Sequence, residues 1–269
     1  MSAAPIPSFE ELKGMLFSLF IVAARVSPLF LLMPFMNRAL VPRMVRFAMS
    51  AGIALILLPI LPPTTDAWPS GVALLSLVFK EAVLGILLGF LIAIPFWTFE
   101  AIGFVIDNQR GASMAATLNP MTGHDSSPLG IAFNFAFITF FMLGGGFSLF
   151  LSVIYDSYRL WAPHEFWPSL SPDAAALLMI QLNRLVMMAL LLSAPVLIAM
   201  LMSELGLALV SRFAPQLQVF FLAMPIKSAL ALFVLVIYLS TLFDYSLAPI
   251  REIATWADRL DPMLRGGAR

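Results

Sequence analysis

Six long apolar blocks constrain this chain more than any other feature of its sequence. They are rich in Leu, Ala and Met, and they lack the polar–apolar alternation of strands in an outer-membrane barrel. Hydrophobic residues make up 61% of the 269 residues and charged residues only 11%. Soluble domains carry about 25% charged residues. We therefore predict an all-α, multi-helix, membrane-associated protein, with apolar blocks at about 12–36, 47–61, 71–106, 129–154, 174–210 and 217–243.

The lengths of these blocks do not fit a row of simple membrane crossings. An upright crossing needs about 20 residues, but block 47–61 is shorter and blocks 71–106 and 174–210 are much longer. Each long block contains a proline, Pro95 or Pro195, and proline kinks or divides a helix. We expect broken helices or helical hairpins in these two blocks. No repeat or linker divides the chain, so residues 1–269 are expected to form a single domain.

Arginine placement gives two conflicting predictions of orientation. Residues 37–46 hold three arginines and no acid, which favours a cytoplasmic location under the positive-inside rule. The tail 244–269 holds four arginines and four acids and is a second cytoplasmic candidate. Five crossings would separate the two places if each block crossed once. Either one assignment is wrong or the blocks are not plain spans, and their odd lengths favour the second explanation.

Glycines mark two further places within the blocks. The three consecutive glycines at 144–146 weaken a helix, so a hinge or a break is expected there. Glu81, Gly85 and Gly89 are spaced by four residues and share one helix face. A GxxxG pair lets another backbone approach closely. This face is therefore predicted to meet protein.

Several charged residues lie inside or beside apolar blocks. A charge at the centre of a bilayer costs about 3 kcal/mol on insertion scales, so these faces are expected to meet protein or water. Snorkelling from the end of a span is the alternative, and it carries equal weight for Lys80, Glu100 and Lys227. The charged residues are Arg25, Lys80, Glu81, Glu100, Arg184, Glu204 and Lys227.

The sequence offers little material for catalysis or for a cofactor. Cysteine is absent, and the two histidines, His124 and His164, are too isolated to predict a metal centre. None of the GxGD, GxSxG, HExxH or P-loop motifs occurs. Net charge is zero, which gives no general attraction to nucleic acid. We expect neither an enzyme nor a cofactor-binding protein.

A long polar connection separates the third and fourth blocks. From Asp107 to Gly130 it reads DNQRGASMAATLNPMTGHDSSPLG, rich in small residues, glycine and proline. A connection of about 22 residues is long for packed elements and is more often functional than idle. In so apolar a chain, this segment is a candidate gate of a membrane assembly. A solvated connecting loop is the alternative.

Four segments together carry a family resemblance. They cover 24–59, 80–123 with its motif IDNQRGASMAATLNPMTG, 127–137 with the motif SPLGIAFNFAF, and 203–232. The chain resembles the SctT/FliR (YscT/SpaR-type) family of type III secretion export-apparatus proteins. The loop motif is similar to the injectisome branch of that family. Gln218 departs mildly from the family pattern, and the tail 245–269 resembles it least.

The resemblance implies a structural role in the bacterial inner membrane. A T-type subunit of this family joins R-type and S-type subunits in a helical export gate, with a U-type switch protein as a further expected partner. The gate forms the pore through which unfolded secreted proteins enter the export path. The subunit is expected to be multi-pass or partly lifted toward the periplasm, which would remove the conflict in orientation.

The family also has a loop of this subunit that plugs the pore, and by order and motif it maps to about 108–123. Its methionines and leucine are expected to pack against a Met-rich ring of partner subunits, and its first polar residues are expected to fix the loop base. The predicted plug residues are Asn108, Gln109, Arg110, Gly111, Met114, Leu118, Asn119, Pro120, Met121 and Gly123.

The predicted interface with partner chains consists of Glu81, Gly85, Gly89, Asn134 and Arg184. The alternative function is a small secondary transporter that works alone, because broken helices and buried charges also mark substrate sites. Such a transporter should contain an internal repeat, and the sequence does not display one.

Overall fold

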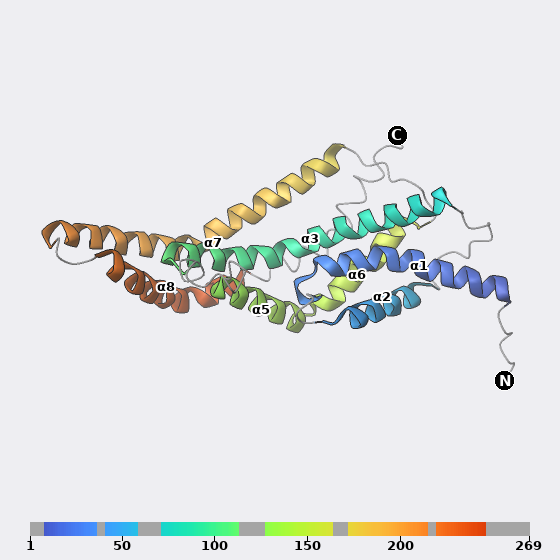
Figure 1. Cartoon of the computed structure of the whole chain (residues 1–269), viewed down its shortest axis with the longest axis horizontal. Coiled ribbons are helices and arrows are strands. Elements are labelled where there is room, and N and C mark those ends of the chain that lie inside the picture. Colours follow the sequence, from blue (N-terminus) through green and yellow to red (C-terminus); the bar gives the residue numbers. More distant parts are fainter. Residues whose placement is uncertain are drawn as a thin grey trace. The chain divides into compact units, whose positions relative to one another are not determined.

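The structure is helical throughout the part of the chain that it describes. This computed structural model describes residues 8–36, 41–58, 71–112, 127–163, 172–214 and 219–245. Every regular element in these ranges is a helix, so the predicted all-α class is confirmed. The elements are α1 (Phe9–Leu32), the short η1 (Pro34–Met36), α2 (Arg43–Leu57), α3 (Val72–Arg110), α5 (Pro128–Leu143), α6 (Gly146–Leu160), α7 (Pro172–Phe213) and α8 (Val219–Asp244) (Figure 1).

Four of the described helices are long and apolar enough to cross a membrane. They are α1, α3, α8 and the part of α7 from Ala176 onward, and α5 with α6 pass the same test together as a pair bent by 77°, which fits a broken span or a re-entrant loop. With 15 residues, α2 is shorter than the roughly 20 that a crossing needs. The apolar blocks of the sequence therefore correspond to helices, but not to six equal spans.

The two longest blocks differ from the expectation of broken helices or hairpins. Helix α3 runs for 39 residues with Pro95 inside it, and α7 runs for 42 residues with Pro195 inside it. Long apolar helices tolerate a proline when neighbouring groups and local adjustments satisfy the freed backbone. A proline in these blocks therefore did not predict a break.

The break expected at the glycines 144–146 is confirmed. Helix α5 ends at Leu143 and α6 begins at Gly146. Between them, Gly145 has φ +76°, in the left-handed region that glycine adopts at no steric cost. A side chain at Gly146 would collide with the ring of Phe141, so the close approach there also requires glycine.

The described helices form two compact units. The first unit contains α1, α2, the part of α3 up to Ala93, and α6 with the first turns of α7. The second unit contains α3 from Ile94, α5, the rest of α7 and α8. The expectation of a single functional domain stays a prediction, and the two units are described separately.

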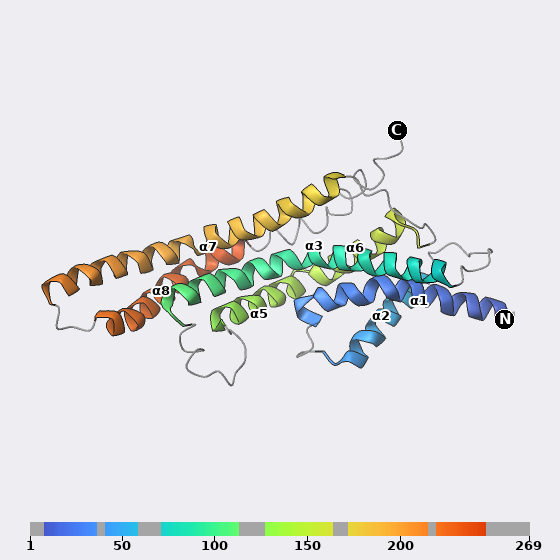
Figure 2. The same ribbon diagram turned by 45° about the horizontal axis from the view of Figure 1, so that its top comes forward.

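In the first unit, α1 is the central helix. It packs against α2 on one side and against α3 on another (Figures 1 and 2). Its residues Val22, Val26 and Leu29 are fully or almost fully buried. Phe150 of α6 stacks on Phe30, with ring centroids 5.9 Å apart. This packing places the polar face of α1 against α3 and the end of α6.

Aromatic side chains join α3, α5 and α8 in the second unit. Phe137 of α5 lies against Phe96 and Phe99 of α3, with ring centroids 4.8 and 4.6 Å apart. Phe140 of α5 stacks on Phe243 of α8 at 4.4 Å. Offset and edge-to-face ring pairs of this kind stabilise beyond the area that they bury. The pairs hold α5 alongside the second part of α3 (Figure 2).

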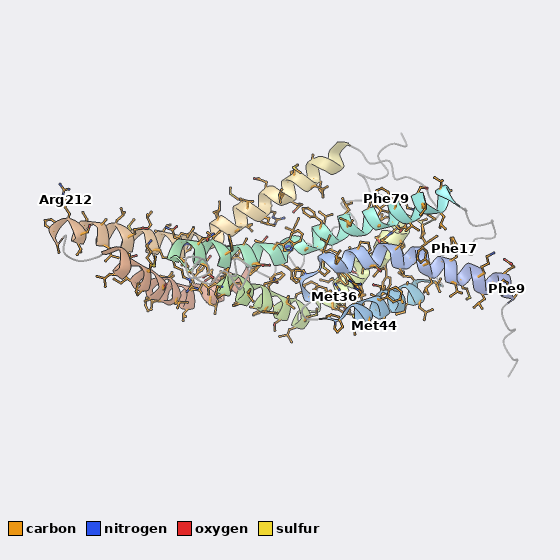
Figure 3. The ribbon with its side chains drawn as sticks, in the orientation of Figure 1. Phe9, Phe17, Met36, Met44, Phe79 and Arg212 are labelled. Carbon is orange, nitrogen blue, oxygen red and sulfur yellow. The ribbon has the colours of Figure 1, made fainter. Side chains whose placement is uncertain are left out.

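Many large apolar side chains remain exposed on this chain. Phe9, Met44 and Phe79 are exposed to 78%, 86% and 63% (Figure 3). Exposed apolar side chains in this number mark a protein that is covered by lipid or by partner proteins.

Candidate functional site

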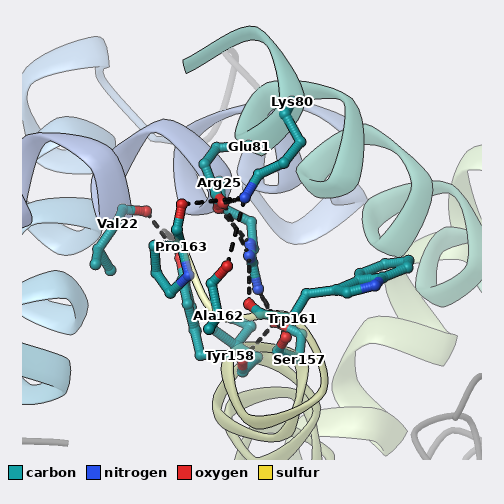
Figure 4. Close-up of polar contacts among 10 residues, drawn as sticks. Val22, Arg25, Lys80, Glu81, Ser157, Tyr158, Trp161, Ala162 and Pro163 are labelled. Carbon is teal, nitrogen blue, oxygen red and sulfur yellow. Dashed lines mark hydrogen bonds and ion pairs between the residues drawn. The ribbon is translucent and has the colours of Figure 1, made fainter. Parts of the chain in front are cut away.

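A buried polar cluster in the first unit, here called the Arg25 cluster, joins three helices (Figure 4). The guanidinium of Arg25 on α1 makes a bidentate pair with the carboxylate of Glu81 on α3, at 2.6 Å from Nε and 3.0 Å from Nη2. Its Nη1 donates to the carbonyl oxygen of Ser157 at 2.8 Å, and Nη2 donates to that of Trp161 at 2.9 Å. Arg25 and Glu81 are 1% and 0% exposed.

The carboxylate of Glu81 also pairs with a second cation. Lys80 Nζ lies 2.8 Å from Glu81 Oε1 and donates to the carbonyl oxygen of Pro163 at 3.1 Å. Two cations therefore share one carboxylate, and the excess positive charge meets carbonyl groups at and after the C-terminal end of α6. A helix C-terminus carries partial negative charge and unpaired carbonyl groups, so cations are stabilised there.

Tyr158 completes the Arg25 cluster from the side of α6. Its ring lies 4.0 Å from the guanidinium carbon of Arg25, which is a cation–π distance. Its hydroxyl donates to the carbonyl oxygen of Val22 at 2.8 Å. With its charges paired and hydrogen-bonded within the chain, the cluster is built to hold α1, α3 and α6 together rather than to bind a substrate.

The predicted glycine face of α3 lies directly beside this cluster. A side chain at Gly85 would collide with the backbone of Arg25, and one at Gly89 would lie 3.1 Å from the Cα atom of Leu29. The sequence assigned Glu81, Gly85 and Gly89 to contacts with a partner chain. In the structure, α1 of the same chain occupies this face, so the close helix approach that a GxxxG pair permits is made internally.

A second polar cluster, here called the Asp107 clasp, joins the end of α3 to the start of α5. Asp107 Oδ2 accepts hydrogen bonds from Ser127 Oγ at 2.7 Å and from the Leu129 backbone N–H at 2.9 Å. Asp107 Oδ1 accepts from Arg110 Nε at 2.7 Å. Ser127 is also the N-cap of α5, because its Oγ accepts from the Gly130 N–H at 2.9 Å.

Glycine allows α3 and α5 to meet closely at this clasp. A side chain at Gly103 would collide with the backbone of Leu129 and Gly130. One turn before Gly103 on α3, the carbonyl oxygen of Glu100 would lie 3.0 Å from a side chain added at Gly130 of α5. The two helix segments that flank residues 113–126 are therefore held in backbone contact.

Snorkelling was the alternative for three charged residues of the apolar blocks, and each of them has a partner within the chain. Glu100 accepts a hydrogen bond from Asn134 Nδ2 at 2.8 Å, between α3 and α5. Lys227 on α8 pairs with Glu204 on α7 at 2.9 Å. Lys80 belongs to the Arg25 cluster. Pairing within the chain, rather than isolated snorkelling, satisfies all three.

The structure describes part of the predicted plug. Asn108 and Gln109 are exposed at the end of α3, Arg110 is half-buried in the Asp107 clasp, and Gly111 has φ +80°. Arg184, a predicted partner contact, is exposed on α7. The other predicted plug residues lie outside the described residues: Met114, Leu118, Asn119, Pro120, Met121 and Gly123.

The part of the chain that the structure describes offers no metal site. No three His, Cys, Asp or Glu side chains there are arranged to hold a metal ion. His124 and His164 both lie outside these residues. The polar side chains of the two clusters instead bind one another and the backbone.

Comparison with known proteins shows which family this chain belongs to. The profile of the family described as bacterial export proteins, family 1, matches residues 16–253, which include both clusters. The chain belongs to this family. Among members of bacterial export family 1, Yop proteins translocation protein T of Yersinia pestis is 39% identical over 218 residues, covering 81% of this chain and 84% of that protein.

Two further relatives extend the comparison across the family. Surface presentation of antigens protein SpaR of Salmonella typhimurium is 36% identical over 220 residues, 81% of each chain. Flagellar biosynthetic protein FliR of Bacillus subtilis is 30% identical over 228 residues, covering 83% of this chain and 86% of that protein. The resemblance predicted from the four sequence segments is confirmed by these relatives of bacterial export family 1.

Sequence reasoning missed several residues of both clusters. The sequence analysis places Asp107 only at the start of a polar connection, although an Asp three residues before Arg110 and a Ser–Pro pair at 127–128 are helix-end signals. Ser157, Tyr158 and Trp161 carried no signal at all. They contact Arg25 across more than 130 positions, which local spacing cannot reveal.

Proposed function

We propose that this chain is a structural component of the type III secretion export apparatus, of the injectisome type. In the proposed assembly it joins R-type and S-type subunits, near the U-type switch protein, and they form the pore through which unfolded secreted proteins enter the export path. The proposed role requires no enzymatic activity and no cofactor. The observation that carries the proposal is the family match over residues 16–253.

The exposed apolar surface supports a role inside an assembly. Only 11% of the most apolar stretch of α8 is buried within the chain, and only 28% of that of α7. Lipid does not drive apolar helices together, so such surface is equally suited to bilayer and to close packing against other helices. We propose the bacterial inner membrane as the location, with part of the subunit lifted toward the periplasm, and Asn134 and Arg184 as contacts to partner chains.

We further propose that residues 108–123 form the plug of this pore. The Asp107 clasp supports this, because it brings the end of α3 and the start of α5 together. The intervening residues therefore leave and rejoin the helix pair at one place. A segment that is anchored at a single base can fill a pore without disturbing the helices that build the pore wall.

Deleting residues 112–122 in the assembled complex tests the plug. We expect the complex to be recovered at the wild-type level and its membrane to become permeable to ions. Conductance of reconstituted complexes and their yield after co-purification give both readouts. A Gly/Ser segment of the same length is the matched control, since it keeps the connection but removes its apolar side chains. Wild-type conductance in both variants at normal yield would disprove the plug.

A further inference from the structure

Glu100 on α3 is a half-buried carboxylate that the described part of the chain leaves without a counter-charge. It accepts a hydrogen bond from Asn134 Nδ2 on α5 at 2.8 Å, its one polar partner among the described residues. Three other carboxylates of the long helices differ in this respect. Glu81, Asp107 and Glu204 each lie within 2.6–2.9 Å of a cation of the same chain. An uncompensated negative charge among apolar helices is unfavourable, so a cation from outside the chain would stabilise Glu100.

The side-chain amide of Asn134 shows the same shortage of donors. Its NH₂ group faces Glu100, because the opposite orientation would bring two acceptors together. Its Oδ1 atom is buried, and no described residue donates a hydrogen bond to it. A buried acceptor without a donor lowers stability. The seam between α3 and α5 therefore lacks both positive charge and hydrogen-bond donors, and a partner that brings them fits this place.

Exposed apolar side chains flank this polar pair. Phe104 follows Glu100 by four residues and Ile131 precedes Asn134 by three, so each lies beside the polar residue on its own helix. Phe104, Ile131 and the neighbouring Phe135 are all exposed. Because Glu100 and Asn134 meet across the two helices, these side chains and the carboxylate belong to one surface of the pair. Lipid tails suit its apolar part but bring no cation, whereas a helix of another protein can bring both.

We propose that Glu100 binds a basic side chain, arginine or lysine, on an apolar helix of a partner subunit. This inference rests on the proposed function, because it names the chemistry of one contact between this chain and its R-type or S-type partners. The exposed apolar side chains pack against the partner helix, and the basic side chain pairs with the carboxylate between them. The contact is selective, since a helix without the cation would leave Glu100 buried and unpaired.

The substitution Glu100→Gln tests the need for the charge. Glutamine keeps an oxygen that can accept the hydrogen bond from Asn134. In the isolated full-length chain in mild detergent, we expect Tm to be unchanged or slightly raised, because no counter-charge within the chain is lost. In the complex co-purified with R-type and S-type subunits, we expect recovery to fall roughly tenfold, because the cation of the partner is buried without its carboxylate.

Glu204→Gln is the matched control for the isolated chain. It also converts a carboxylate on a long apolar helix to an amide, but its cation, Lys227, belongs to the same chain. Its Tm should fall slightly, whereas the Tm of Glu100→Gln should not. A Tm that falls as far or further in Glu100→Gln would show that the carboxylate serves the chain itself, and would overturn the inference.

Charge reversal identifies the residue of the partner. With Glu100→Lys, recovery of the complex should fall at least as far as with Glu100→Gln, because two cations would meet. Each basic residue in the apolar helices of the R-type and S-type subunits is then changed to Glu in turn. One of these changes should restore recovery with Glu100→Lys and lower it with the wild-type chain. If none restores recovery, the inference is overturned.

A milder form of the same experiment applies if Glu100→Lys does not fold. The basic residues of the partners are then changed to Gln, each with the wild-type chain and with Glu100→Gln. At the paired residue, Glu100→Gln should cause no further loss of recovery, because the interaction is already gone. Additive losses at every basic residue would overturn the inference.

The recovery of the wild-type complex tests the proposed function separately. If the wild-type chain does not co-purify with R-type and S-type subunits, the proposed assembly fails and the inference falls with it. If the wild-type chain assembles and Glu100→Gln assembles equally well, only the inference fails. A higher recovery with Glu100→Gln would show that this surface meets lipid, and would likewise overturn it.

Discussion

Helices α3 and α8 are both long and apolar, yet the chain covers them very differently. Within the most apolar stretch of α3, 61% of residues are buried, whereas only 11% are buried in that of α8. The mean hydropathy of the two helices is nearly the same. What separates them is that α3 carries buried charges and close-contact glycines. These bind it to α1, to α5 and, through Lys80, to the backbone that follows α6.

The difference shows which residues determine the helix–helix contacts in so apolar a chain. In an apolar environment, burying one more leucine brings little advantage, because lipid tails are as apolar as the helix. A paired charge or a backbone contact at a glycine, in contrast, has one correct partner. The polar and small residues of α3 therefore specify the fold, and the apolar surface of α8 is left for lipid or for partner subunits.

Removing the negative charge at the centre of the Arg25 cluster should have the largest effect on stability. Glu81→Gln leaves Arg25 and Lys80 buried without a counter-charge, and breaking a buried pair in this way costs about 3–5 kcal/mol. Thermal unfolding of the purified chain in mild detergent should show a strongly lowered Tm. Asp156→Asn, which breaks an exposed pair with Arg159, is the control. Equal Tm values for both variants would contradict the assignment of the cluster.

Filling the glycine contact of α3 should have the next largest effect. In Gly85→Ala, the added methyl group collides with the backbone of Arg25, and overpacking of this kind costs roughly 1–3 kcal/mol. Gly206→Ala on α7 is the matched control, because nothing lies within 4 Å of its added methyl group. Alanine is favoured over glycine in a helix, so the control should be neutral or slightly stabilised. A stable Gly85→Ala chain would mean that α1 and α3 are not in contact.

The ion pair between α7 and α8 should contribute less. Glu204 and Lys227 lie 2.9 Å apart, but the Glu204 side chain is 47% exposed. Partly exposed pairs contribute about 0–1 kcal/mol, so Glu204→Gln should shift Tm of the isolated chain only slightly. The same substitution measured in the co-purified complex sharpens the comparison. A larger loss there would show that partner subunits bury this pair.

Enlarging an exposed side chain of α8 should leave the isolated chain unchanged. Val236 is 73% exposed, so the larger ring in Val236→Trp can extend away from the chain, and Tm in detergent should equal that of the wild type. If partner subunits cover α8, the bulky ring obstructs their packing and lowers the yield of co-purified complex. A normal yield would instead assign this face to lipid, because a tryptophan is well tolerated there.

Several elements of this fold could be predicted from the sequence, and others could not. The helices, the break at 144–146 and the close approach at Gly85 follow from composition and spacing, because glycine acts on its own helix. The broken helices or hairpins expected at Pro95 and Pro195 did not form. Whether a proline divides a helix depends on the groups packed around it, and these are distant in sequence.

The sequence by itself determined that the chain is helical, apolar and similar to an export family, because residue type and periodicity are local properties. It also marked Arg25 and Glu81 as charges whose helix faces meet protein or water, and it left snorkelling open for Lys80. Only the tertiary structure decided that they pair with one another and with the end of α6. It likewise decided that Asp107 joins α3 to α5 across 20 residues. Such pairings depend on which helices meet in space, and no pattern within one segment encodes that.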